Sequence, residues 1–222
     1  MGGRGYETAQ SLAARGETPI AVERFLRDCR INTIFEGSSE IMRLFIAREA
    51  LDPHLKIGAP MLNTQLPLKV RALSAAHAAL FYASWYPRQW FPAAHPDAGF
   101  HPVLARHVRN AEAASRRLAR RLFQAMAKHG PKLEREQVLL GRFVDIGTEL
   151  FAILATCARA QEMLDHDGAA NVLPLADYFS LTSTRRVEEL FRSLSRNADS
   201  KGYKLAQDLM EGRLDWLEQG IV

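Results

Sequence analysis

Glu36 is the residue of this 222-residue chain whose type and setting best suit acid–base chemistry. It stands between the apolar pair Ile34–Phe35 and Gly37. A carboxylate among apolar neighbours loses hydration, so its proton affinity rises, which suits a general base that removes a proton from carbon. Gly37 permits close approach of a ligand to the backbone. The alternative is that Glu36 is an ordinary loop carboxylate.

A helix that begins just after Gly37 would be a second feature useful for binding. Ser38 or Ser39 can cap it, and its first turn would direct amide N–H groups and the positive end of the helix dipole outward. That end of a helix suits phosphate groups. The competing interpretation is that both serines are only caps, and spacing alone does not choose between them.

Helical periods dominate the chain and no strand-like alternation persists, so we predict an all-α fold. The third helix should end near Leu51, before Asp52–Pro53. A connector is predicted at 56–66, because Gly58 and Pro60 lie in it, and a proline-broken stretch is predicted at 87–102. The predicted helices are 8–14, 19–30, 38–51, 67–86, 102–128, 139–164, 173–195 and 199–212.

The clearest helix lies at 139–164, where apolar residues recur at alternating steps of four and three. This spacing is typical of the apolar stripe of a helix in a bundle. The stripe consists of Leu139, Phe143, Ile146, Leu150, Ile153, Cys157, Ala160 and Leu164. We therefore predict an antiparallel bundle from about residue 67 onward, with this stripe in its core.

The composition is that of a soluble globular protein, with 47% hydrophobic and 24% charged residues. The only two cysteines, Cys29 and Cys157, indicate neither a disulfide framework nor a zinc site, and the seven histidines have no metal-binding spacing, so no metal is expected. The net charge of +4 is too mild to favour nucleic acid. The N-terminus lacks a signal peptide pattern, and its adjacent glycines suggest that Met1 stands at an internal edge of a longer protein.

Two surface features leave their purpose open. An arginine-rich run occupies 106–128, opposed only by Glu112. Such a run is usually a solvated helix face, but it can also meet anionic lipid headgroups or the phosphates of coenzyme A. Aromatic residues surround the proline-broken stretch, which favours either a membrane interface or packing of the rings onto the bundle. They are Trp85, Tyr86, Trp90, Phe91 and Phe100.

Four sequence blocks, in order and at matching spacing, resemble the end of the catalytic fold of the acyl-CoA dehydrogenase family. They are Gly2–Tyr6 (GGRGY), Val22–Arg24 with Arg27–Ile31 (VER and RDCRI), Ile34–Ser38 (IFEGS), and Ile41–Arg43 with Ile46–Glu49 (IMR and IARE). We therefore expect residues 1–55 to end a catalytic helical domain. Residues 56–222 resemble, more loosely, the C-terminal helical extension of the very-long-chain branch, with the best match at 136–143.

The resemblance implies FAD-dependent α,β-dehydrogenation of a fatty acyl-CoA to a trans-2-enoyl-CoA, as in fatty-acid β-oxidation. Glu36 matches the glutamate that removes the α-proton before hydride leaves Cβ for the flavin. The backbone N–H at the same position helps hold the thioester carbonyl, which stabilises the enolate-like charge. Glu36 and Gly37 are therefore the expected acyl-CoA contacts.

The resemblance also implies which residues of this chain contact FAD. Ser38 and Glu40 match positions beside the flavin cofactor, although the family more often has threonine and glutamine or another polar residue there. Gly2 and Gly3 match a loop that approaches the FAD of the neighbouring subunit. The family's N-terminal helical domain and β-domain are missing from this sequence, so we expect the chain alone to be inactive and without stoichiometric FAD.

The family further implies an electron-transfer flavoprotein as acceptor and a homodimer as the assembly of the full-length protein. We expect a cytoplasmic enzyme, with peripheral contact to the inner membrane through the aromatic and basic residues. Two alternatives stay open. The chain is a stand-alone helical module for partner or membrane binding, or it is part of an acyl-CoA oxidase, which shares the fold and the glutamate.

Overall fold

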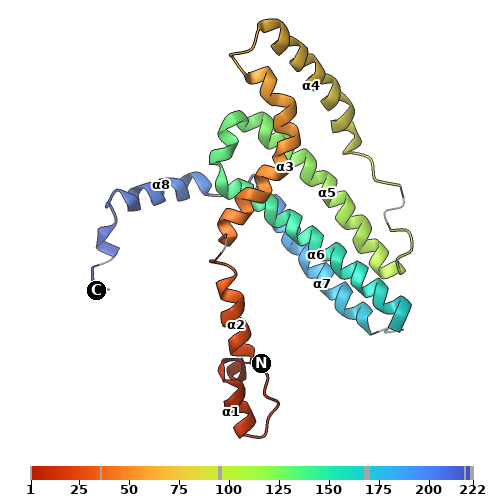
Figure 1. The fold of residues 1–222 in the computed structure, drawn as a ribbon, viewed down its shortest axis with the longest axis vertical. Helices are drawn as coiled ribbons and strands as arrows, with labels where there is room; N and C mark the ends of the chain where they lie inside the picture. The colour runs from red at the N-terminus through yellow and green to blue at the C-terminus, as the bar shows by residue number, and fades with distance from the viewer. Residues whose placement is uncertain (1, 36, 95–96, 168–170, 218, 221–222) are drawn as a thin grey trace. The chain divides into compact units, whose positions relative to one another are not determined.

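The computed structural model describes residues 2–35, 37–94, 97–167, 171–217 and 219–220, and is shown in Figure 1. Every regular element in these ranges is a helix, which confirms the all-α prediction. The chain divides into two compact units, Met1–Ala50 and Leu51–Val222. The division falls inside α3, which spans Ser39–Leu62. The predicted boundary at residue 55 stays a prediction.

The first unit consists of short helices with little interior. A 3₁₀ turn at Gly2–Tyr6 precedes α1 (Ala9–Ala14), whose N-terminus is capped by Thr8: the Ser11 amide donates to its hydroxyl at 3.2 Å. Helix α2 spans Val22–Ile31 and has no buried residue. Only Leu12 and Ala47 in this unit are buried among the described residues. The unit therefore has almost no hydrophobic core of its own.

Two predicted helix boundaries are wrong in this part of the chain. Helix α2 does not begin at Pro19, because residues 18–21 form tight turns in which the Val22 amide donates to the Ile20 carbonyl at 2.9 Å. Helix α3 does not end near Leu51 but continues through Pro53 and Pro60 to Leu62. The connector predicted at 56–66 is therefore mostly helix.

Pro53 is tolerated inside α3 because of where it lies. Proline removes one backbone hydrogen bond, and the freed carbonyl four residues earlier belongs to Glu49, an exposed residue that water can solvate. One residue later, His54 is held by α4: its Nδ1 lies 3.0 Å from the Tyr82 hydroxyl, and its ring meets Trp85 at 5.0 Å between centroids. Tertiary contacts thus hold the helix beyond the proline.

The second unit contains the longer helices. They are α4 (Leu68–Arg88), α5 (Pro102–His129), α6 (Gln137–Asp167), α7 (Val172–Ser193) and α8 (Asp199–Met210), with 3₁₀ turns at Gly130–Arg135 and Asp215–Leu217. Pro102 occupies the first turn of α5, where its missing N–H has no intrahelical partner to lose. The prediction of long helices from residue 67 onward is confirmed, to within two or three residues at each end.

The hydrophobic core lies among α5, α6 and α7, which run side by side (Figure 1). Its centre includes Leu104, Ile146, Ile153, Cys157, Ala176, Val187 and Phe191. The stripe predicted on 139–164 is confirmed, since it is buried from Leu139 to Ala160 and half-buried at Leu164. Within the described parts of the chain, no helix is both long and apolar enough to cross a membrane.

Polar groups inside the bundle are mostly paired. His107 is 2% exposed, and its Nε2 lies 2.7 Å from Asp177 Oδ1 of α7. The bond to His107 lowers the pKa of Asp177, and Arg106 adds to the effect. Burial raises the pKa of the Cys157 thiol, whose Sγ lies 3.9 Å from the Ser180 hydroxyl. Cys157 is therefore a buried, unreactive residue rather than a redox site.

Candidate functional site

Glu36, the predicted catalytic base, lies outside the described residues. Its apolar neighbours are placed: Ile34 and Phe35 end a turn after α2, where both amides donate to the Ile31 carbonyl at 3.0 and 2.9 Å. Their side chains are 60% and 66% exposed. These side chains are exposed to water, so the apolar environment that would raise the pKa of a carboxyl group here requires cover from outside residues 1–50.

Gly37 occupies a backbone conformation that only glycine adopts easily. Its φ is +112°, and an added Cβ would lie 3.1 Å from the Sδ of Met42. The positive φ turns the chain from the loop into α3, and the close sulfur leaves little room for a side chain. The sequence-based role of Gly37, close approach to a ligand, is not tested by this geometry but is compatible with it.

The N-terminus of α3 is capped by Ser38. The Ile41 amide donates to the Ser38 hydroxyl oxygen at 3.4 Å, and the Met42 amide donates to the Ser38 carbonyl at 2.9 Å. Capping uses the hydroxyl oxygen as an acceptor, so the hydroxyl hydrogen stays available to a ligand. Glu40 is exposed in the first turn. Its carboxylate interacts favourably with the helix dipole but repels a phosphate group.

Gly2 and Gly3 lie in the exposed 3₁₀ turn at the start of the chain. A Cβ at either position would meet no atom within 4 Å. This chain by itself therefore gives no packing reason for the two glycines. Their proposed role toward FAD depends on groups that other parts of the protein would supply.

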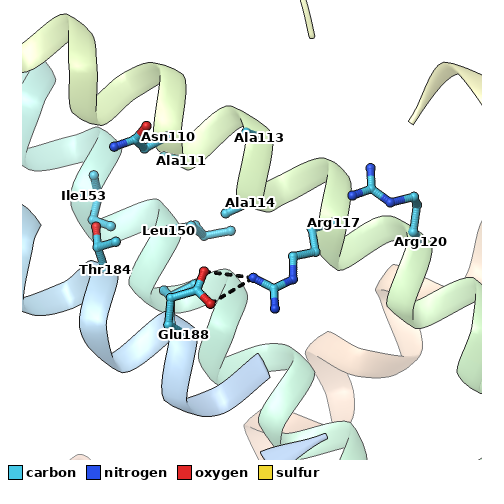
Figure 2. Close-up of a pocket in the computed structure, with 11 residues that line it drawn as sticks. Asn110, Ala111, Ala113, Ala114, Arg117, Arg120, Leu150, Ile153, Thr184 and Glu188 are labelled. Carbon is cyan, nitrogen blue, oxygen red and sulfur yellow. Dashed lines mark hydrogen bonds and ion pairs between the residues drawn. The ribbon is translucent and has the colours of Figure 1, made fainter. Parts of the chain in front are cut away.

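A second candidate site is an open cleft in the bundle, with a volume of about 290 Å³ (Figure 2). Helices α5 and α7 form its walls, and Leu150 and Ile153 of α6 form its floor. Alanines at 111, 113 and 114 of α5 also line it. At one rim, Arg117 Nη1 donates to both carboxylate oxygens of Glu188 at 2.8 and 3.0 Å.

The arginine run of α5 consists mainly of side chains that connect elements. Arg106 bonds Asp177 at 2.8 Å, and Arg109 pairs with Asp97. Arg116 donates to the Arg88 carbonyl at 2.7 Å and also pairs with Glu112. These contacts join α5 to α7 and to the end of α4. The expected solvated face is therefore largely a set of structural cross-links.

Two arginines of the run, Arg120 and Arg121, have no ion-pair partner among the described residues, although Arg120 also connects elements by donating to the Gln89 carbonyl. With Trp90, Arg117 and Gln124 they line a further cavity of about 230 Å³, beside the cleft. The guanidinium of Arg120 lies 4.2 Å from the centroid of the Trp90 ring. Sequence reasoning missed this grouping, because Trp90 is 30 residues away from Arg120 and only the return of the chain after α4 brings them together.

The aromatic residues divide into two groups. Trp85 is half-buried, with ring contacts to His54 at 5.0 Å and Phe123 at 6.0 Å between centroids. Trp90 and Phe91 are 62% and 68% exposed. For Trp85 the packing interpretation is therefore favoured, while Trp90 and Phe91 are presented to solvent.

The segment that contains the motif blocks is similar to a known protein family. A family model described as "Acyl-CoA dehydrogenase, C-terminal domain" matches residues 1–51. The whole chain is 50% identical, over 228 aligned positions, to proteins named "Probable acyl-CoA dehydrogenase FadE10" from Mycobacterium bovis and Mycobacterium tuberculosis. The chain spans 35% of the length of these relatives.

More distant relatives extend the similarity beyond the motif blocks. The "Very long-chain specific acyl-CoA dehydrogenase, mitochondrial" of Rattus norvegicus is 29% identical over 180 residues, covering 79% of this chain and 27% of the relative. The human protein of the same name is 28% identical over 76% of this chain. Both alignments extend well past residue 51. These findings confirm the resemblance: residues 1–51 match the C-terminal domain of the acyl-CoA dehydrogenases, and the chain as a whole is similar to part of proteins named as acyl-CoA dehydrogenases.

Proposed function

We propose that this chain is the C-terminal part of an FAD-dependent acyl-CoA dehydrogenase that oxidises a fatty acyl-CoA to the trans-2-enoyl-CoA. The observation that carries the proposal is the ordered set of motif blocks in residues 2–49, which coincides with the family match to residues 1–51. The 50% identity over the whole chain supports it. We also propose a domain division into 1–55 and 56–222; the family match, which ends at residue 51, supports a boundary in this region.

The residues of the motif segment fit a flavin cofactor in part. Ser38 offers a hydroxyl hydrogen beside a turn at which Gly37 admits a close neighbour. Glu40 can only accept hydrogen bonds, so it fits a hydroxyl or N–H group of the cofactor and not its phosphates. Neither described cavity lies in residues 1–50. We propose that these residues form one edge of a cofactor site and that other parts of the protein supply the rest.

In the proposed reaction, Glu36 removes the α-proton of the thioester. The backbone N–H at the same position holds the thioester carbonyl and stabilises the negative charge that develops on its oxygen. FAD, when bound, supplies the acceptor for the hydride that leaves Cβ. The exposed Ile34 and Phe35 would gain cover from the rest of the protein, which would dehydrate the carboxylate between them and Gly37 and raise its basicity.

A conservative substitution tests the assignment. In the full-length protein, Glu36→Gln should leave FAD bound but abolish reduction of the flavin by acyl-CoA, measured by stopped-flow absorbance. Glu134→Gln is the matched control, because Glu134 is an exposed residue of the 3₁₀ turn that follows α5. Flavin reduction at a near wild-type rate in Glu36→Gln would disprove the role of Glu36.

The partners follow from the same proposal. We expect an electron-transfer flavoprotein to reoxidise the flavin, and a homodimer in which Gly2 and Gly3 approach the FAD of the neighbouring subunit. An acyl-CoA oxidase would differ in its use of oxygen. Anaerobic reduction of the full-length protein by acyl-CoA, followed by mixing with either oxygen or an electron-transfer flavoprotein, distinguishes the two by the rate of flavin reoxidation.

Peripheral membrane contact, in an otherwise cytoplasmic protein, is a second candidate function, favoured by the exposure of Trp90 and Phe91. Aromatic rings beside arginines suit the headgroup region of a bilayer. The full-length protein should float with anionic liposomes at low salt, and Trp90→Ala should weaken flotation. Trp85→Ala is the contrasting variant. Because Trp85 packs on Phe123, this substitution should not change flotation. Failure of the wild type to float would exclude membrane contact.

A further inference from the structure

The cavity lined by Trp90, Arg120 and Arg121 has a net positive charge. Arg117 also lines it, but its charge is compensated by the ion pair with Glu188, in which Nη1 donates to both carboxylate oxygens. Among the described residues, no carboxylate lies within ion-pair distance of Arg120 or Arg121. Arg121 instead donates to the amide oxygen of Gln124 at 3.3 Å, and Arg120 donates to the Gln89 carbonyl. Two cationic side chains thus face one space of about 230 Å³.

The contacts of Arg120 orient it without neutralising it. Stacking on Trp90 at 4.2 Å fixes the plane of the guanidinium, and the bond to the Gln89 carbonyl occupies only part of its N–H donors. A cation beside the last carbonyls of α4 is also favourable for that helix, which explains why a half-buried arginine is tolerated here. The guanidinium is therefore held in place for a ligand before the ligand arrives.

We propose that Arg120 and Arg121, positioned by Trp90 and Gln124, bind a doubly charged phosphate group. A phosphate monoester bears about −1.5 to −2 charges at neutral pH, which matches the two uncompensated guanidinium groups. Planar guanidinium donors suit phosphate oxygens because two parallel N–H···O bonds can form. The residues of the proposed site belong to the second unit of the chain, whereas the motif blocks belong to the first.

The bound phosphate group can belong to a soluble phosphate or to the phosphomonoester headgroup of a lipid. Titration of the full 222-residue chain with inorganic phosphate by calorimetry at low ionic strength tests the first. Sedimentation with phosphatidylcholine vesicles, with and without phosphatidic acid, tests the second. Binding to phosphate assigns a soluble ligand, and binding only to phosphatidic acid vesicles assigns a lipid headgroup. Binding to neither would overturn the proposal.

Three matched substitutions distinguish binding in the cavity from general charge attraction. Arg120→Gln and Arg121→Gln should each weaken phosphate binding about fivefold or more. The loss of affinity should be smaller than for buried arginines, because both side chains are partly exposed to solvent. Arg185→Gln removes the same charge from an exposed residue of α7 that lines neither cavity, and should change affinity less than about twofold. Equal weakening by Arg185→Gln would refute a specific site.

A substitution at Glu188 should increase the affinity for phosphate rather than decrease it. Glu188→Gln would free Arg117 and add a third uncompensated cation to the cavity, so phosphate affinity should rise by about two- to fivefold. Glu189→Gln removes a charge from the neighbouring exposed residue without releasing Arg117, and should have little effect. If both variants strengthen binding equally, the effect is one of net charge alone and the proposed site is wrong.

Discussion

Residues 1–50 and the bundle of α5, α6 and α7 differ in what their sequences specify. The first region contains all four motif blocks, yet only Leu12 and Ala47 are buried in it among the described residues. The bundle has no motif that predicts chemistry, yet it encloses a continuous core around Ile146, Ile153 and Phe191. The segment that contains the motif blocks therefore has far less hydrophobic core than the bundle.

The difference has a physical basis. If residues 1–50 have the catalytic role that we propose, their apolar side chains would contact substrate, cofactor and neighbouring domains, and without these partners the side chains remain in water. Phe25, Ile34, Phe35, Ile41 and Phe45 are all more than half exposed. Apolar surface on this scale marks an interface rather than a monomer surface. The bundle, in contrast, buries the apolar stripe of α6 against α5 and α7.

The largest expected effect is the loss of the cofactor from the isolated chain. Because residues 1–50 offer only one edge of a flavin site, purified residues 1–222 should be colourless and should not dehydrogenate acyl-CoA. The full-length protein, prepared in parallel, should show the visible absorption of bound flavin. A yellow 222-residue chain with turnover would show that the first region forms a complete site after all.

A matched pair of isoleucine truncations compares the two regions directly. Ile153→Ala in the core should destabilise the bundle by about 2–5 kcal/mol, through lost burial and the cavity that remains. Ile41→Ala, at a residue 59% exposed in α3, should change stability by less than about 0.5 kcal/mol. Urea unfolding followed by circular dichroism measures both, and equal losses would contradict the contrast.

The pair Arg142–Asp199 should make the stability of the second unit depend on pH. Arg142 Nη2 lies 2.7 Å from Asp199 Oδ1, which joins α6 to the first turn of α8, and this hydrogen bond lowers the pKa of Asp199. A carboxylate with a lowered folded-state pKa contributes stability above its unfolded pKa of about 4, and loses it as the pH falls toward the folded value. Stability should therefore decrease below about pH 4.

Asp199→Asn should remove that part of the acid dependence and lower stability at neutral pH by about 1 kcal/mol, since the pair is bidentate and mostly shielded. Thermal unfolding between acid and neutral pH measures it. Glu189→Gln, at an exposed residue of α7, is the control and should leave the slope intact. An unchanged slope in Asp199→Asn would show that the pair does not contribute.

The smallest effect is expected at Gly37. Gly37→Ala must place a Cβ near the Met42 sulfur at a positive φ, but the surrounding segment is exposed and can shift. We expect a loss of no more than about 1 kcal/mol in this chain, measured by hydrogen exchange of the first amides of α3. Gly3→Ala, which meets no neighbour within 4 Å, should have no effect on those amides.

Several structural features were predictable because they depend on local pattern. The steps of four and three in 139–164 predicted the buried side of α6, and Ile146 and Ile153 are 0% and 2% exposed. The end of α3 was not predictable in this way. Proline normally stops a helix, but contacts with α4 hold α3 beyond Pro53, among them those of His54 with Tyr82 and Trp85.

The candidate sites also differ in whether local sequence pattern predicts them. The motif blocks identified the family and the segment around Glu36 without any coordinates, because reactive residues at fixed spacing are themselves the signal. Glu36 itself lies outside the described residues, so its assignment as the base stays a prediction. The cavity of Trp90, Arg120 and Arg121 had no such signal, since its members come from separate elements.

The sequence by itself determined the helical class, the core side of α6 and the family of residues 1–51, because each depends on the spacing of residues that are close together in the chain. The tertiary structure alone decided which arginines are neutralised. Glu188 of α7 compensates Arg117 at 2.8 Å, while Arg120, three residues later on α5, meets Trp90 instead. The physical reason is that charge compensation depends on which side chains meet across helices, and those meetings depend on packing between segments far apart in the chain.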